Sequence, residues 1–150
     1  MRGATKLSEM TSTLEAPNLT YDGMTVGDVF VDTSITVTAE AIAEFRRTIR
    51  VGAGSLGVGG ERFAPPTMAA MWTVPRVMFN EWNVPVGGIH ARQSWRFVKF
   101  IQAGTEFRVR ICLKEKFIRK ERPWVVFQSR LTDGNREEVA SGEMTLVWPT

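Results

Sequence analysis

The sequence predicts an α+β fold in which an antiparallel sheet wraps around one apolar helix. Two observations carry this prediction. Four segments after residue 85 have the composition and alternation of strands, and one segment before them is the only helix apolar enough to cover a sheet. A strand and another helix come earlier still, so the predicted order is one strand, two helices and then four strands in a meander.

The first half of the chain supplies the early strand and the first helix. Residues 29–37, VFVDTSITV, are rich in β-branched side chains, which favour a strand. Thr38 is suited to cap a helix over residues 39–50, in which the acidic Glu40 comes early and the arginines come late, as the helix dipole prefers. Gly52 is predicted to end this helix.

The apolar helix expected at the centre of the sheet spans residues 66–80. Pro66 can start a helix because its missing N–H would have no partner in the first turn, and Pro75 is expected to bend or end the helix. In the sheet that follows, IQAGT is expected to join the first two strands, and Asp133-Gly134-Asn135 forms a hairpin turn before the last. The four strands are expected over residues 89–100, 105–118, 123–132 and 137–148.

Length and composition indicate one ordinary globular domain. The 150 residues are 43% hydrophobic and 23% charged, and residues 1–18 are polar without periodicity, so we expect a flexible N-terminal arm followed by a single domain over residues 19–150. Cys112 is the one cysteine and excludes an internal disulfide. Nothing in the sequence matches a signal peptide or a membrane span, so we expect a cytoplasmic protein without membrane contact.

Three motif-based functions are disfavoured. GAGSLG (52–57) matches the glycine pattern of dinucleotide-binding loops, but a helix precedes it and no parallel βαβ unit follows. One His and one Cys are too few for a zinc site, so we expect no metal. The run RQSWRF suggests a nucleic-acid surface, yet its alternation fits a strand with Trp95 and Phe97 on one face and Arg92 and Arg96 on the other. The net charge of +3 suits an anionic ligand such as a phosphorylated carrier, and we expect no nucleic-acid partner.

Three segments resemble, in order and spacing, the parts of one known family: MTVGDVFVDTSITVTAEAIAEFRRTI, WRFVKFIQAGTEFRVRICLKEKF and LTDGNREEVASGEMTLVWP. They are similar to the opening, the central strand pair and the last hairpin of the MaoC-like acyl hydratases and dehydratases, which have a hotdog fold. The resemblance covers residues 21–149. It implies a homodimer, or a heteromer with a catalytic hotdog subunit. It also implies an acyl thioester substrate carried on coenzyme A or acyl carrier protein, with no other cofactor.

The sequence departs from this family at the residues that carry its chemistry. The family's catalytic Asp and His, five positions apart, correspond to Gly60 and Pro65, and the aspartate of a later turn corresponds to Thr105. Hydration of an enoyl thioester needs a base to activate water and an acid to protonate carbon, and proline and glycine have no titratable side chain. APPT at the helix start resembles the variant in non-catalytic lobes of the family, which pair with a catalytic lobe and shape its substrate tunnel.

Two titratable residues remain as candidates for catalysis, Glu61 and His90. Glu61 is one position from the missing Asp, and His90 is the side chain that titrates nearest neutral pH, although a lone strand histidine is more often a packing residue. At the helix start, the N–H groups of Thr67 and Met68 are expected to face a thioester carbonyl. The expected substrate-binding residues are Pro65, Pro66, Thr67, Met68, Met71, Trp72 and His90; for Met68, Met71 and Trp72 a plain core role is an equal alternative.

The sequence leads to one function and two alternatives. The leading hypothesis is the substrate-shaping, non-catalytic subunit of an enoyl hydratase or 3-hydroxyacyl dehydratase. The first alternative is a self-sufficient homodimeric hydratase or thioesterase that uses His90 and Glu61. The second is a non-enzymatic module that binds acyl thioesters or nucleic acid.

Overall fold

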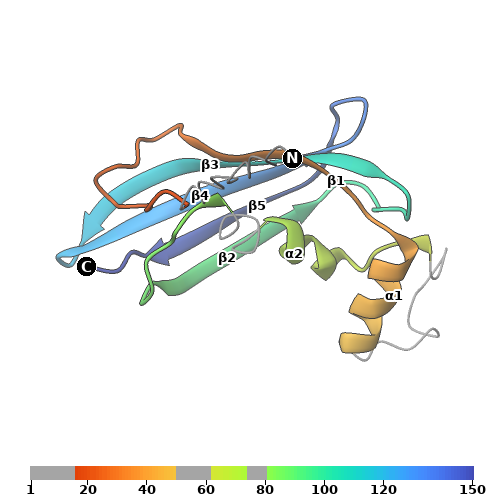
Figure 1. Cartoon of the computed structure of the whole chain (residues 1–150), viewed down its shortest axis with the longest axis horizontal. Helices are drawn as coiled ribbons and strands as arrows, with labels where there is room; N and C mark the ends of the chain where they lie inside the picture. The colour runs from red at the N-terminus through yellow and green to blue at the C-terminus, as the bar shows by residue number, and fades with distance from the viewer. Residues whose placement is uncertain (1–15, 50–61, 74–80) are drawn as a thin grey trace, which may run out of the picture.

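Five antiparallel strands form one sheet in the computed structural model of the chain, which describes residues 16–49, 62–73 and 81–150 (Figure 1). The strands run in the order β1-β3-β4-β5-β2 across the sheet. The predicted α+β class with an antiparallel sheet is confirmed. The strands are β1 (Val29–Thr36), β2 (Ile89–Phe97), β3 (Glu106–Arg119), β4 (Arg122–Thr132) and β5 (Glu138–Val147), and the helices are α1 (Ala39–Thr48), the 3₁₀ helix η3 (Pro66–Ala69) and α2 (Ala70–Thr73).

One face of the sheet, here called the inner face, carries the core. The apolar residues of β3 predicted to alternate with charged ones all point to it and are at most 1% exposed: Phe107, Val109, Ile111 and Leu113. Burial of one such side chain stabilises the fold by roughly 1.5–3 kcal/mol. Met68 and Ala69 of η3 are buried with them, and the Trp72 ring meets Phe107 edge-on at 5.4 Å. The predicted helix start at Pro66 is confirmed, whereas residues 74–80 lie outside the described part of the chain.

The predicted four-strand meander is wrong for its first strand. β3, β4 and β5 do follow one another as neighbours, and Asp133 lies in the β4–β5 turn as expected. β2, however, pairs with β5 and forms one edge of the sheet. β5 and β4 therefore lie between β2 and β3, the next strand in the chain. The connection over residues 98–105 is longer than the two to five residues of a typical hairpin loop. It is anchored across the end of the sheet by the buried Ile101 and by the Val37 N–H, which donates to the Thr105 carbonyl at 3.1 Å.

Helix α1 starts as predicted and ends earlier. The Thr38 hydroxyl accepts a hydrogen bond from the Ala41 N–H at 3.1 Å, which confirms the cap. The helix ends at Thr48, before the predicted Gly52, which lies outside the described residues. Arg46, one of the arginines in the last turn of the helix, is buried. Its Nη2 donates to the Phe63 carbonyl at 2.5 Å, which ties α1 to the residues just before the helix η3.

The first described residues already belong to the folded domain. Pro17 and Asn18, which the sequence had assigned to the flexible arm, pair with Asn83 through backbone and side-chain hydrogen bonds. Leu19 and Met24 are buried in the core cluster. The remainder of the expected arm and the GAGSLG loop lie outside the described residues. Within the described ranges, no helix is both long and apolar enough to cross a membrane.

Candidate functional site

The start of η3 and its surroundings form the candidate site, which we call the helix mouth (residues 64–67). Its position is set by backbone contacts with the segment that leaves β2. The Ala64 N–H donates to the Ile101 carbonyl and the Ala103 N–H to the Arg62 carbonyl, both at 2.8 Å. The helix mouth therefore lies at the end of the sheet where β2 finishes and β3 begins.

The two prolines at the helix mouth have the geometry of a helix start. Pro65 has extended backbone angles, with φ −56° and ψ 138°, and Pro66 is the first residue of η3. The expectation that the Met68 N–H is free for a thioester carbonyl is wrong. That group donates to the Pro65 carbonyl at 2.8 Å, because the first turn is a tight 3₁₀ turn rather than an α-helical one. The donor expected from Met68 is thus used by the chain itself.

A small cavity of about 120 Å³ lies beside the helix mouth. Its walls are apolar apart from one ionisable side chain, that of Lys99. The Lys99 ammonium is 2.8 Å from Asp133 and also contacts Glu137, and hydrogen bonding to these two carboxylates raises the pKa of Lys99 above its ordinary value of 10.5. Lys99 is therefore a fixed cation at neutral pH and no base. The cavity is lined by Ala64, Pro66, Phe97, Val98, Lys99, Phe100 and Ile101.

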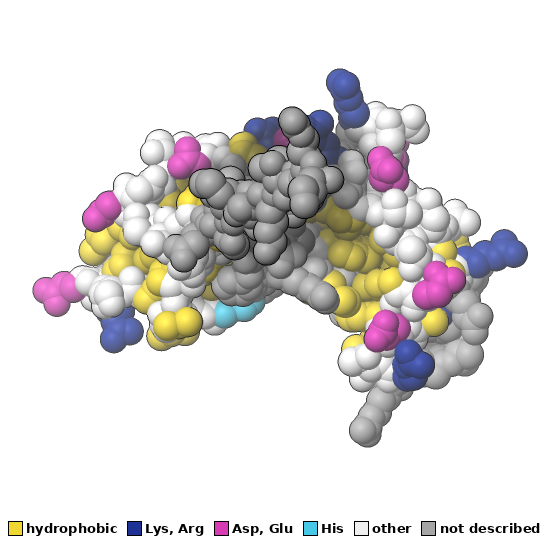
Figure 2. Space-filling view, viewed as in Figure 1, with side chains coloured by type: hydrophobic (Ala, Val, Ile, Leu, Met, Phe, Trp, Pro, Cys, Tyr) yellow, Lys and Arg dark blue, Asp and Glu magenta, His cyan; other side chains and the backbone are white. Residues whose placement is uncertain are grey.

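The three apolar residues expected to line a tunnel occupy different environments. Met68 is 2% exposed and belongs to the core cluster. Trp72 is half-buried and packs against that cluster, while Met71 is 40% exposed. Figure 2 shows hydrophobic side chains gathered on the surface around η3 and α2. Of the three, Trp72 is the residue that has both a buried edge and an accessible one.

His90 does not lie at the helix mouth. It pairs with Leu146 near the beginning of β2, and Phe97, which lines the mouth cavity, ends the same strand. Seven strand residues span about 20 Å. His90 is exposed, and no side-chain hydrogen bond or ion pair joins it to a described residue. Glu61 lies outside the described residues.

Gln93 is a polar residue of the inner face that sequence reasoning did not select. It pairs with Met144, and the next inner-face residue along β2 is Trp95. Both atoms of its side-chain amide, Oε1 and Nε2, are buried and have no hydrogen-bond partner. An unpaired buried amide costs roughly 1–3 kcal/mol, so Gln93 is a candidate contact for a polar ligand. The signal in the sequence was strand alternation, which places Gln93 on the same face as Trp95 and Phe97.

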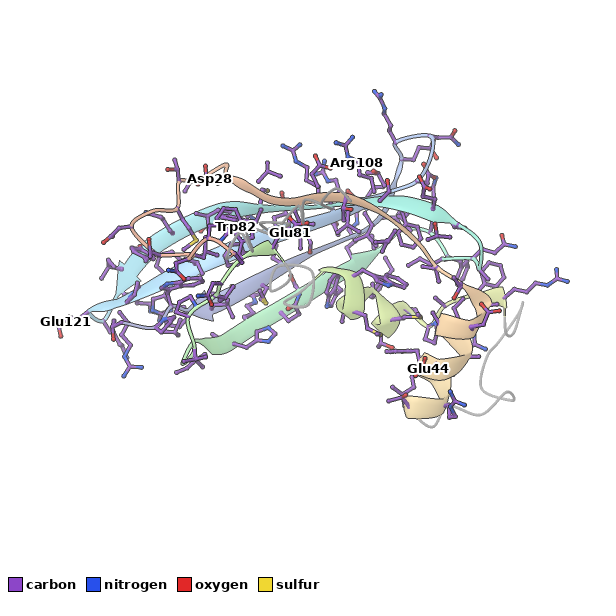
Figure 3. The ribbon with its side chains drawn as sticks, viewed as in Figure 1. Asp28, Glu44, Glu81, Trp82, Arg108 and Glu121 are labelled. Atoms are coloured by element: carbon purple, nitrogen blue, oxygen red, sulfur yellow. The ribbon has the colours of Figure 1, made fainter. Side chains whose placement is uncertain are left out.

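Other features near the sheet point to structure rather than chemistry. Trp82 lies in front of the sheet with Glu81 beside it (Figure 3); its Nε1 donates to the Phe30 carbonyl at 3.2 Å and its ring meets that of Phe30 at 5.4 Å. Arg108 on β3 forms an ion pair with Asp32 on β1, with Nη2 and Oδ2 2.8 Å apart. Among the described residues, no three His, Cys, Asp or Glu side chains gather into a group suited to a metal ion.

The architecture has relatives among solved structures. The MaoC-like dehydratase from Rhodospirillum rubrum superposes with a TM-score of 0.68 at 21% identity, covering 89% of this chain and 99% of that one. The HadBC (3R-hydroxyacyl-ACP dehydratase) complex from Mycobacterium tuberculosis gives 0.62 at 22% identity, covering 76% and 89%. The ChsH1-ChsH2 complex from the same organism gives 0.60 at 14% identity, covering 80% and 83%. No family model and no curated protein matches the sequence.

These likenesses define the class of fold. The antiparallel sheet with its covering helix is the hotdog architecture found in MaoC-like dehydratases, as the resemblance implied. The chain has the hotdog fold.

Proposed function

We propose that this chain binds acyl thioesters of coenzyme A or acyl carrier protein and shapes the substrate site of a catalytic hotdog partner. The observation that carries the proposal is the helix mouth. It has the geometry of a helix start, but prolines occupy it, and the one ionisable side chain in its cavity is Lys99, which two carboxylates hold. Because the described residues at the helix mouth supply neither an acid nor a base, this site is suited to binding and shape rather than to hydration.

The surface around the helix mouth supports the presence of a partner. Phe97, Val98 and Phe100 are 42%, 49% and 82% exposed, and they adjoin the mouth cavity. Adjacent exposed apolar side chains of this size are typical of a surface that another protein covers. Two of the similar structures, HadBC and ChsH1-ChsH2, are themselves complexes. A heteromer is therefore the assembly that we propose.

The alternative, a self-sufficient hydratase or thioesterase, finds less support. It requires His90 to act on a thioester at the helix mouth, yet about 20 Å of β2 separates His90 from the mouth of the same chain. A general base must come within hydrogen-bond distance of the proton that it removes, about 3 Å. His90 is better placed to line a surface or a pocket at its own end of β2.

Calorimetry and turnover assays test the proposal together. The purified chain is titrated with acyl-coenzyme A thioesters of increasing chain length, and enoyl-thioester hydration is assayed with and without a hotdog protein that carries the intact Asp and His. We expect binding by the chain, no appreciable hydration by the chain alone, and a changed chain-length preference of the partner. Turnover of about 1 per second or more by the chain alone would contradict the proposal. Absence of binding for every thioester would leave a scaffold without a substrate role.

A further inference from the structure

The outer edge of β2 is an open sheet edge. β2 pairs with β5 on one side, and no described strand lies along its other side (Figure 1). Seven of its nine residues are exposed, Gln93 and Trp95 are half-buried, and none is proline. A long, exposed edge of this kind is a template for pairing with another strand, and natural proteins cover it or discourage it with charge.

The charges on this edge have one sign. Residues 85–105 contain no Asp or Glu, and β2 carries Arg92 and Arg96. Both lie on the outer face, since they pair with Thr145 and Ser141 of β5 and alternate with the inner residues Gln93 and Trp95. Neither arginine forms an ion pair with a described residue, and the neighbouring Glu143 on β5 is already held by Lys114 at 2.6 Å. Glu115 lines the same outer groove but lies on β3, three strands away from Arg92 across the sheet.

A second copy of the chain fits this edge poorly. In a twofold antiparallel pairing, residues that face each other lie on the same face of the sheet. If the pairing is centred on Ser94, Arg92 of one copy lies directly opposite Arg96 of the other, with Cβ atoms about 5 Å apart. If it is centred one residue to either side, the same arginines are diagonal neighbours at about 7–8 Å. Like charges at these distances oppose pairing and are within the Debye length of about 8 Å at physiological salt.

We propose that the β2 edge selects a different hotdog subunit, one whose edge strand carries Asp or Glu on its outer face, and rejects a second copy of this chain. The occupant is chosen by charge complementarity with Arg92 and Arg96. This inference deepens the proposed function, because it names the surface that binds the partner and explains why the partner is not identical. The test of this inference uses no thioester, so the charge selection at the β2 edge and the proposed thioester binding can each fail without the other.

The charge rule can be tested with the chain itself. Arg92→Glu/Arg96→Glu is mixed in equal amounts with the wild type at about 50 mM salt, and native mass spectrometry and sedimentation record the assemblies. We expect a one-to-one mixed dimer that forms at least about tenfold more tightly than a dimer of either protein alone, because the edges are then complementary. We also expect the mixed dimer to weaken at high salt and to slow hydrogen exchange at the β2 amides.

A matched control moves the same charge change away from the edge. Lys120→Glu/Arg122→Glu alters two exposed residues at the β3–β4 hairpin and should form no mixed dimer with the wild type. Circular dichroism checks that each variant is folded. The proposal is overturned if the wild type alone dimerises through β2 as tightly as the mixture does. It is equally overturned if the mixture shows less than this tenfold preference, or if the control variant forms the same mixed dimer.

Discussion

The indole ring of Trp95 on β2 lies directly over Gly142 on β5. A Cβ atom added at Gly142 would stand 2.6 Å from the ring and 2.8 Å from the Ser94 carbonyl oxygen. The two residues are direct partners in the β2–β5 register. Glycine at this position is therefore what allows the edge strand to carry a large aromatic side chain on the inner face.

Gly142→Ala should destabilise the fold. Both contacts are too short for any real Cβ, and one involves backbone, so β2 and the Trp95 ring must shift; overpacking of this kind costs about 1–3 kcal/mol. Urea unfolding followed by tryptophan fluorescence measures the change. Gly134→Ala is the control, because nothing lies within 4 Å of a Cβ there, and it should change stability by less than about 0.5 kcal/mol. Equal stability of both variants would contradict the packing described here.

Gln93→Leu should keep or raise the stability of the protein, and thioester binding by this variant tests whether a ligand uses the Gln93 amide. The wild-type amide is buried without a partner, so its removal relieves a desolvation cost of roughly 1–3 kcal/mol. If a bound ligand uses this amide, the variant loses that hydrogen bond. Thermal unfolding and calorimetry give the two readouts. Gln102→Leu, an exposed glutamine in the next segment, should alter neither. A marked loss of stability in Gln93→Leu would mean that the amide is paired in solution.

Trp72→Ala should cost stability and change ligand preference together. Trp72 is only half-buried against Phe107, so we expect a loss of about 2–3 kcal/mol, below the 3–5 kcal/mol of a fully buried ring. Met68→Leu, a swap of similar volume in the core, should cost less than about 1.5 kcal/mol. Calorimetry with thioesters of several chain lengths should show longer chains favoured in Trp72→Ala. Unchanged preference in both variants would place the acyl chain elsewhere.

The β4–β5 turn should lose stability at both extremes of pH. Hydrogen bonding to Lys99, together with the Glu137 and Asn135 N–H groups, lowers the pKa of Asp133 below its ordinary 3.8, so this contribution is present above that value and is lost as pH falls below it. The pKa of Lys99 is raised instead, by the same contacts with Asp133 and Glu137. Its contribution to stability is therefore present below 10.5 and is lost as the pH rises above that value. Asp133→Asn keeps the turn acceptor but removes the charge, so its melting temperature should depend less on acidic pH.

Local sequence patterns predicted most of the elements because each depends on neighbours in the chain. Alternation along residues 107–113 fixed the inner face of β3, the Thr38 side chain predicted the cap of α1, and Pro66 predicted the start of η3. The pairing of β2 with β5 was missed, since the order of strands depends on a long connection whose anchors, such as Ile101, are set by distant contacts.

The candidate site also has features that the sequence determined and features that only the tertiary structure decided. The sequence by itself determined that Gly60 and Pro65 stand where the family that it resembles has its catalytic Asp and His, because the identity of a side chain does not depend on folding. Only the tertiary structure decided that His90 lies at the far end of β2 from the helix mouth, that the Met68 N–H is used within its own turn, and that the Gln93 amide is buried without a partner. The reason is physical: burial, strand order and hydrogen-bond partners arise from residues far apart in the chain, and no local pattern records them.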